Sequence, residues 1–430
     1  MTLSKSFSEF LDNLKIDNAD NISKRYREIT KKLNKTFRNT DSETDNCLQV
    51  GSFGRHTGIK GISDLDMLYI MPDCKWEKYK KYPGLLLRDT KDALVDRYPQ
   101  TTIKVDRLVV DVFFNDFTFE VQPVFEEKDG DEINYKFPDT KYDDYRTTKP
   151  RQELEEMRYF EQDHGKTLRR LCKMMRAWKD HVGLKMGGLL LDTLAHRFLS
   201  NHSEYDFAVF YDFPKLCQDF FEFLKDEPKQ DHYQALGSGQ DVKVHKPFQS
   251  KAKKAYKKAT EAIDEESEET RNDLWRSIFG KQFPKSDDTE STNRSQYGFS
   301  YSDPEEFIED KYPIDIKYDL TLDCEVKRDG FREARLSIIL LAEQRVARVR
   351  SLDFSFTTDT PMPYNVRWKV KNVGNEAKRR NCLRGEIIMS NRNYFERHET
   401  ADFRGPHYVE CYIIKDNKVV ARDRIDVPIQ

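Results

Sequence analysis

The segment Asp64–Ile70 constrains the fold of the N-terminal half most strongly. Asp64-Leu65-Asp66 leads directly into the apolar run Met67-Leu68-Tyr69-Ile70. Side chains alternate between the two faces of a β-strand, so the two carboxylates share one face. Oxygen ligands placed side by side suit a divalent metal ion. The segment therefore predicts a strand whose polar face begins with a candidate metal site.

Two neighbouring segments extend this candidate site. Gly51-Ser52 supplies flexible backbone, N–H groups and a hydroxyl, which together can hold phosphates. In-line phosphoryl transfer with two metal ions needs a third carboxylate. Glu120 is the candidate, because polar and apolar residues alternate from Phe117 to Gln122 and place Glu120 on the polar face of a half-buried strand. Asp111, on the preceding strand, is the alternative third ligand. The alternative to a metal site is that the three acids are unrelated residues on the protein surface.

The stretch Gly51-Ser52-Phe53-Gly54-Arg55-His56-Thr57, followed by Asp64-Leu65-Asp66, resembles the DNA polymerase β-like nucleotidyltransferase superfamily. Within it, the pattern is similar to oligoadenylate synthetases, cyclic GMP-AMP synthase and the bacterial cyclic-oligonucleotide synthetases called CD-NTases or SMODS. The resemblance covers residues 1 to about 284. It implies that Asp64 and Asp66 bind two Mg²⁺ or Mn²⁺ ions per site and that Glu120 binds the ion that activates the attacking hydroxyl. It also implies that Gly51 and Ser52 contact the NTP. Glu120 departs from the pattern, since the family's third acid is usually Asp.

Residues 166–180 predict a helix with an apolar stripe and a basic stripe. Arg169, Lys173 and Arg176 follow one another at i, i+4 and i+7. On pattern alone this is an ordinary solvated face. However, the segment Leu171–Trp178 resembles the family segment whose two basic residues hold the β- and γ-phosphates of the donor. The resemblance therefore implies that Lys173 and Arg176 bind the triphosphate. Thr57 also fits the family pattern, or it ties the loop down.

Composition limits the class of protein. The chain has 430 residues with 35% charged and 37% apolar residues, which predicts two or three domains with true cores. The net charge of the whole chain is −3, which does not indicate a nucleic-acid-binding protein. The seven cysteines are scattered without a Cys-x-x-Cys pair, which is typical of reduced thiols in a cytosolic protein. No apolar run approaches the roughly 20 residues that span a bilayer. We therefore expect a cytoplasmic protein with no membrane partner.

The pattern along the chain predicts an α+β protein: a polymerase β-like nucleotidyltransferase core with a helical lobe, then an all-β sandwich. We expect the catalytic domain over residues 1–150, with N-terminal helices, and a helical lobe that completes the NTP pocket over 151–283. A polar linker follows over 284–303, and a sandwich-like sensor domain over 304–430. The strands expected in the sandwich are Ile314–Val326, Leu336–Val349, Asn365–Val373, Gly385–Ser390, His407–Ile414 and Val419–Val427.

The C-terminal third carries a second resemblance and a focused basic cluster. Tyr364–Ala377, with Leu383-Arg384-Gly385, resembles the sensor domain fused to some SMODS enzymes. Within 18 residues only Glu376 opposes seven basic residues, a local net charge of +6. This cluster predicts either a solvated sandwich face or a surface that contacts the phosphates of RNA or a nucleotide. The basic residues are Arg367, Lys369, Lys371, Lys378, Arg379, Arg380 and Arg384.

The family resemblance implies an enzyme that makes a cyclic di- or trinucleotide second messenger from NTPs. The product would activate a separate effector in antiphage (CBASS-type) defence, and the C-terminal domain would sense an RNA or another phosphate-rich trigger. One alternative is template-independent nucleotidyl transfer to RNA or protein. Another is a nucleotide-binding sensor that has lost catalysis, which Glu120 favours and the intact Ser52, Asp64 and Asp66 oppose.

Overall fold

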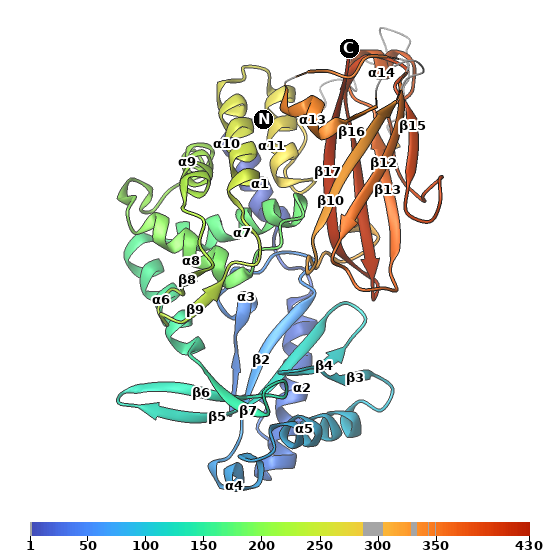
Figure 1. The fold of residues 1–430 in the computed structure, drawn as a ribbon. Coiled ribbons are helices and arrows are strands. Elements are labelled where there is room, and N and C mark those ends of the chain that lie inside the picture. Colours follow the sequence, from blue (N-terminus) through green and yellow to red (C-terminus); the bar gives the residue numbers. More distant parts are fainter. Residues whose placement is uncertain (1, 287–303, 328–332, 343, 349) are drawn as a thin grey trace. The chain divides into compact units, whose positions relative to one another are not determined.

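The computed structural model describes residues 2–286, 304–327, 333–342, 344–348 and 350–430 (Figure 1). The chain forms two compact units, which we name after the functions expected from the sequence: residues 2–177 with 186–284, the catalytic unit, and residues 178–185 with 285–430, the sensor unit. The expected linker falls largely on residues 287–303, which lie outside the described residues. The expected boundary at residue 150 stays a prediction, because the catalytic unit continues across it.

A seven-stranded sheet forms the first half of the catalytic unit. Its order is β1-β2-β5-β4-β3, and β6 and β7 continue from the far half of β5. Only β2 and β5 pair in parallel among these strands. The strands are β1 (Cys47–Gln49), β2 (Asp64–Ile70), β3 (Thr102–Val105), β4 (Val110–Phe113), β5 (Thr118–Asp129), β6 (Glu132–Asp139) and β7 (Asp144–Thr148).

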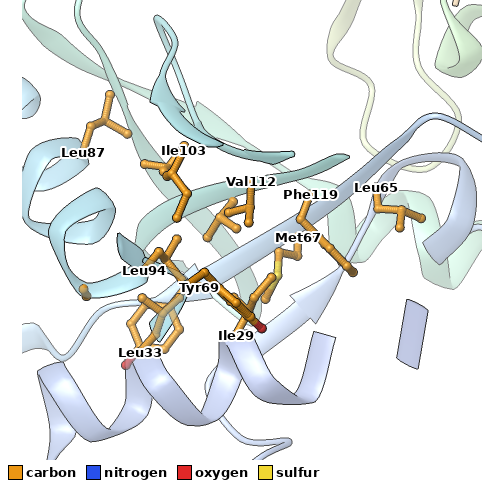
Figure 2. Packing of buried hydrophobic residues seen from close by; sticks show 14 of the residues in the cluster. Ile29, Leu33, Leu65, Met67, Tyr69, Leu87, Leu94, Ile103, Val112 and Phe119 are labelled. Carbon is orange, nitrogen blue, oxygen red and sulfur yellow. The ribbon is translucent and has the colours of Figure 1, made fainter. Parts of the chain in front are cut away.

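Helices α2 (Ala19–Arg38) and α5 (Pro83–Arg97) supply the core that covers one face of this sheet. Figure 2 shows Ile29 and Leu33 of α2 beside Met67 and Tyr69 of β2, with Phe119 of β5 nearby. Burying such apolar surface is the main stabilising contribution in folding. Since the apolar residues of β2 face this core, its acidic residues occupy the opposite face.

Helices dominate the second half of the catalytic unit, as the periodicity predicts. Gly280, with φ of +81°, is the C-terminal cap of the last of them. The longer helices are α1 (Leu3–Asn13), α6 (Pro150–His164), α7 (Thr167–His181), α8 (Gly188–Leu199), α9 (Phe213–Asp226), α10 (Gln249–Asp264) and α11 (Glu268–Phe279). The short elements are α3 (Gly51–Gly54), α4 (Trp76–Tyr79), β8 (His232–Gln234) and β9 (Asp241–Lys243).

The sensor unit is a sandwich of two four-stranded antiparallel sheets, which confirms the predicted fold class. Phe354 from one sheet and Trp368 and Ile413 from the other are buried in one core. The first sheet has the order β11 (Ala334–Arg335), β10 (Leu320–Lys327), β12 (Ser351–Thr358) and β15 (Arg397–Thr400). The second has the order β14 (Arg384–Ile388), β13 (Asn365–Lys371), β16 (Gly405–Lys415) and β17 (Lys418–Ile429).

One strand expected in the sandwich is wrong. Residues Leu336–Leu341 form helix α13, and β12 follows at Ser351–Thr358, where no strand was expected. The run Leu-Ser-Ile-Ile-Leu-Leu is almost uniformly apolar, and such a run has no period that separates a buried strand from a helix. A second short helix, α14 (Asn375–Arg379), follows β13.

Candidate active site

Three acids form a row across neighbouring strands of the catalytic unit. Asp66 on β2 lies opposite Glu120 on β5, and Glu120 lies opposite Asp111 on β4. Directly opposite residues point to the same face of a sheet, and Asp64 shares this face by alternation. Adjacent strands are about 4.8 Å apart, so Glu120 is one strand from Asp66 and Asp111 is two. The fold thus brings together every carboxylate that the sequence nominates.

The register favours Glu120 over Asp111 as the third ligand. Glu120 is half-buried between the fully buried Phe119 and Val121, which confirms the expected alternation along β5. Both cross-strand neighbours of Glu120 are acids, whereas Asp111 has Lys104 of β3 on its other side. Like charges directly opposite one another are unfavourable, and a bound cation relieves them.

The residues around Asp66 suit a divalent metal ion in their chemistry. Gly51 has φ of +62°, and a Cβ at this position would lie 1.8 Å from Oδ2 of Asp66, so only glycine permits this close approach. Carboxylates are the hard oxygen ligands that Mg²⁺ and Mn²⁺ prefer. No group of three or more His, Cys, Asp or Glu side chains in the described part of the chain is arranged to hold a metal ion. The assignment of Asp64, Asp66 and Glu120 as ligands therefore stays a prediction from register and chemistry.

The segment 51–58 folds back on itself around Ser52. The backbone N–H groups of Thr57 and Gly58 both donate to the carbonyl oxygen of Ser52, at 2.9 and 3.0 Å. The N–H of Arg55 donates to the carbonyl of Gly51 at 3.1 Å. These bonds make residues 51–58 one compact loop, here called the Gly-Ser loop, beside the acidic row.

A buried network of charged and polar groups lies behind the Gly-Ser loop. Asp192 of α8 accepts hydrogen bonds from Nε of Arg55 at 2.9 Å, Oγ1 of Thr57 at 3.0 Å and Nη2 of Arg176 at 2.8 Å. Arg55 also donates to Glu153 of α6 at 3.0 Å. Sequence reasoning missed Asp192, although a lone acid within the apolar stripe Leu189–Leu199 was the available signal, because a buried carboxylate requires partners.

Arg176 and Lys173 lie in different surroundings. The guanidinium of Arg176 is buried and donates to the carbonyl and hydroxyl of Thr57, both at 2.7 Å, and to Asp192. These partners indicate that Arg176 holds the Gly-Ser loop in place. The predicted contact of Arg176 with the triphosphate stays a prediction. Lys173, one turn earlier, is half-buried beside Arg169.

A cluster of cations surrounds Lys173. Burial lowers the pKa of Lys173, and the neighbouring charges of Arg169 and Lys15 lower it further. The pKa of His56 is lowered in the same way by burial and then by Arg169 and Lys173. Arg169 also pairs with Glu161. A bound polyanion would reduce the repulsion between these positive charges. The predicted contact of Lys173 with a triphosphate would provide such a polyanion.

The prediction of an exposed basic strand face in the sensor unit is wrong. Lys369 and Lys371 on β13 are only 2% and 7% exposed, and both pair with Glu305, at 2.7 and 3.5 Å. The sequence count missed Glu305 because it precedes the cluster by more than 60 residues. The described ion pairs of the remaining basic residues are Arg379 and Arg380 with Glu376 and Arg384 with Glu399.

All seven cysteines are free thiols, as expected. Within the described residues, no helix combines the length and the apolar character needed to cross a membrane.

Comparisons with known proteins agree with this architecture. Residues 1–160 match the Second Messenger Oligonucleotide or Dinucleotide Synthetase (SMODS) domain, and residues 302–430 match the Adenylyl/Guanylyl and SMODS C-terminal sensor domain. A search of curated proteins found no match.

Three solved structures illustrate the similarity of fold. CdnC of E. coli MS115-1 in complex with HORMA-deltaN has a TM-score of 0.51 at 14% identity, over 65% of this chain and 98% of that chain. CdnC with ATP has a TM-score of 0.51 at 15% identity, over the same shares of 65% and 98%. The apo form of Vibrio cholerae DncV has a TM-score of 0.45 at 17% identity, over 56% of this chain and 69% of that chain. At such identities the two CdnC structures bear on the fold alone, so the family assignment depends on the two domain matches. Because a synthetase domain and its sensor domain match in the expected order, the chain belongs to the CD-NTases, nucleotidyltransferases that make oligonucleotide or dinucleotide second messengers, and it carries their C-terminal sensor domain.

Proposed function

We propose that this protein makes a cyclic di- or trinucleotide from NTPs, with two Mg²⁺ or Mn²⁺ ions as cofactors. The observation that carries the proposal is the pairing of Asp66 with Glu120 on adjacent parallel strands, with Asp64 on the same face and the Gly-Ser loop beside them. When bound, the metal ions would lower the pKa of the attacking hydroxyl and neutralise the triphosphate.

The chain's own residues divide the remaining work. The Ser52 hydroxyl contacts a phosphate of the donor, and Gly51 lets the loop approach Asp66 closely. Lys173, supported by Arg169, balances the charge of the triphosphate. Such fixed groups stabilise charge that develops in the transition state without reorganising during the reaction.

The family resemblance and the sensor match support a role in bacterial antiphage signalling, in which the product acts on a separate effector. CdnC has been solved with ATP, so ATP is the first substrate to test. Seven free thiols support a cytoplasmic location, where cysteines stay reduced.

The test is to incubate the purified full chain with all four NTPs, one of them α-³²P-labelled in turn, with Mg²⁺ or Mn²⁺, and then to add phosphatase. We expect a small phosphatase-resistant product from the wild type and none from Asp66→Asn. A ladder or a labelled macromolecule would instead establish template-independent transfer. Tight NTP binding without any product under all conditions would establish the non-catalytic alternative.

A further inference from the structure

We infer that Asp192 and Thr57 are positioning residues that set the turnover rate, because Asp192 holds the Gly-Ser loop in place through Thr57. Neither residue belongs to the acidic row or to the cations around Lys173. The inference depends on the proposed function for its kinetic consequences only. Its structural consequence, an ordered Gly-Ser loop, can be measured without any substrate.

The surroundings of Asp192 show a site built to receive the loop. Asp192 is fully buried in α8 between apolar neighbours such as Leu191 and Leu194. Its carboxylate accepts from the side chains of Arg55 and Thr57, both in the Gly-Ser loop, and from Arg176 of α7. Hydrogen bonds to charged groups are stronger than those between neutral groups. One carboxylate therefore ties the loop to two helices.

Thr57 passes this restraint on to Ser52. Its hydroxyl donates to Asp192 and accepts from Arg176, at 3.0 and 2.7 Å, and its carbonyl accepts from Nε of Arg176 at 2.7 Å. Its N–H donates to the carbonyl of Ser52 at 2.9 Å. Side chain and backbone of Thr57 are thus both held, so the position of Ser52 follows from that of Asp192. Small displacements of positioning groups reduce reaction rates strongly.

The charges of the network support the same reading. Two guanidinium groups, Arg55 and Arg176, are balanced by two carboxylates, Asp192 and Glu153. Burial lowers the pKa of Arg55, but Asp192, Glu153 and Asp66 together raise it above its ordinary value. Arg55 is therefore within electrostatic range of Asp66, a proposed metal ligand, and Asp192 balances the charge of Arg55.

The decisive variant is Thr57→Val, which is isosteric and leaves every charge in place. We expect kcat to fall about tenfold with little change in KM for ATP, since the loop's mean position matters more in the transition state than in binding. We also expect amide hydrogen exchange of residues 51–58 to rise about tenfold in the absence of NTP. Thr57→Ser keeps the hydroxyl and should restore both properties.

Thr90→Val is the matched control. Thr90 is also fully buried, and its hydroxyl donates to the carbonyl of Leu86 within α5, at 2.8 Å, far from the network in sequence. Both valine variants lose a buried hydroxyl, so the melting temperature should change similarly in the two. Only Thr57→Val should lose kcat and loop protection. Asp192→Asn is a second informative variant. In the fraction of this variant that remains folded, residues 51–58 should lose the same protection against amide hydrogen exchange.

Each outcome decides the inference. Unchanged exchange in residues 51–58 of Thr57→Val would overturn it, whatever the activity. Equal loss of kcat in Thr90→Val and Thr57→Val would show a general loss of stability and would also overturn it. If the wild type makes no product from any NTP, the proposed function fails, but the exchange measurement still tests whether Asp192 and Thr57 order the loop.

Discussion

Two rows of charged side chains cross β-sheets of this protein, one in each unit, and their charges are arranged in opposite ways. In the catalytic unit, three acids lie side by side across β2, β5 and β4: Asp66, Glu120 and Asp111. In the sensor unit, the charges alternate across β13, β16 and β17: Lys369, Glu410 and Arg424. Opposite charges across strands stabilise a sheet, and like charges destabilise it.

The charges of the row in the sensor unit stabilise the fold, whereas those of the acidic row suit a metal site. Nζ of Lys369 lies 3.7 Å from Oε2 of Glu410, and both side chains are buried. Burial raises the pKa of Glu410, yet Lys369 and Arg422 hold it well below its ordinary value. The charges of this alternating row are paired by the chain itself, Lys369 with Glu410 and Glu305, and Glu410 with Arg422, so the row serves the fold. The acidic row instead places like charges opposite one another, an arrangement that a bound divalent cation would stabilise, as the proposed metal site requires.

Replacing Asp64 or Asp66 by Asn should have the largest effect. We expect the rate of product formation to fall by at least about 100-fold, because a lost metal ligand removes several kcal/mol of transition-state stabilisation. The melting temperature should change little, because Asn keeps the size and shape of the Asp side chain. Product assays and thermal melting measure the two effects. Turnover like that of the wild type in either variant would remove these residues from the active site.

The alternating row should respond in the opposite way. Lys369→Ala removes a cation that pairs with both the buried Glu410 and the half-buried Glu305, so we expect a loss of about 3–5 kcal/mol in the free energy of unfolding. Urea denaturation of the full chain measures it. Arg379→Ala is the control, because the pair with Glu376 is exposed and should contribute nothing measurable. A harmless Lys369→Ala would show that the row does not stabilise the sensor unit.

Substitutions at Glu120 and Asp111 test which of the two residues is the third metal ligand. We expect Glu120→Gln to lower kcat by about 10- to 100-fold and Glu120→Asp to remain active with an altered Mg²⁺/Mn²⁺ preference. Asp111→Asn should change kcat by less than about threefold, because Asp111 lies two strands from Asp66 and opposite Lys104. Kinetics at varied metal concentration test this. A normal Glu120→Gln with an inactive Asp111→Asn would make Asp111 the third ligand.

The smallest expected effect is a pH-dependent difference in melting temperature between the wild type and Glu410→Gln. The folded pKa of Glu410 is below its unfolded value of about 4.3. Its carboxylate therefore stabilises the fold above that value, and this contribution is lost as the pH falls through the folded pKa. Glu410→Gln should have a lower melting temperature than the wild type at neutral pH, and the gap should narrow from about pH 5 to about pH 3. A gap that is constant with pH would exclude Glu410 as the titrating group.

Local patterns were sufficient for much of this molecule. Alternation along β2 placed Asp64 and Asp66 on one face, and alternation along β5 placed Glu120 between the buried Phe119 and Val121. Helical periodicity identified α7, α8 and α10. These predictions hold because the period of a strand or helix decides which side chains share a face. The apolar run that forms α13 lacked such a period, and the prediction there failed.

Tertiary structure decided which charges meet. The sequence by itself determined that the N-terminal half contains an acidic strand and a Gly-Ser turn, and that β13 has a basic face. Only strand register set Asp66 beside Glu120, and only the fold placed Glu305 on Lys369 and Asp192 on Thr57. A charge acts on whatever lies within a few ångströms of it, and the spacing of residues along a chain does not report that distance.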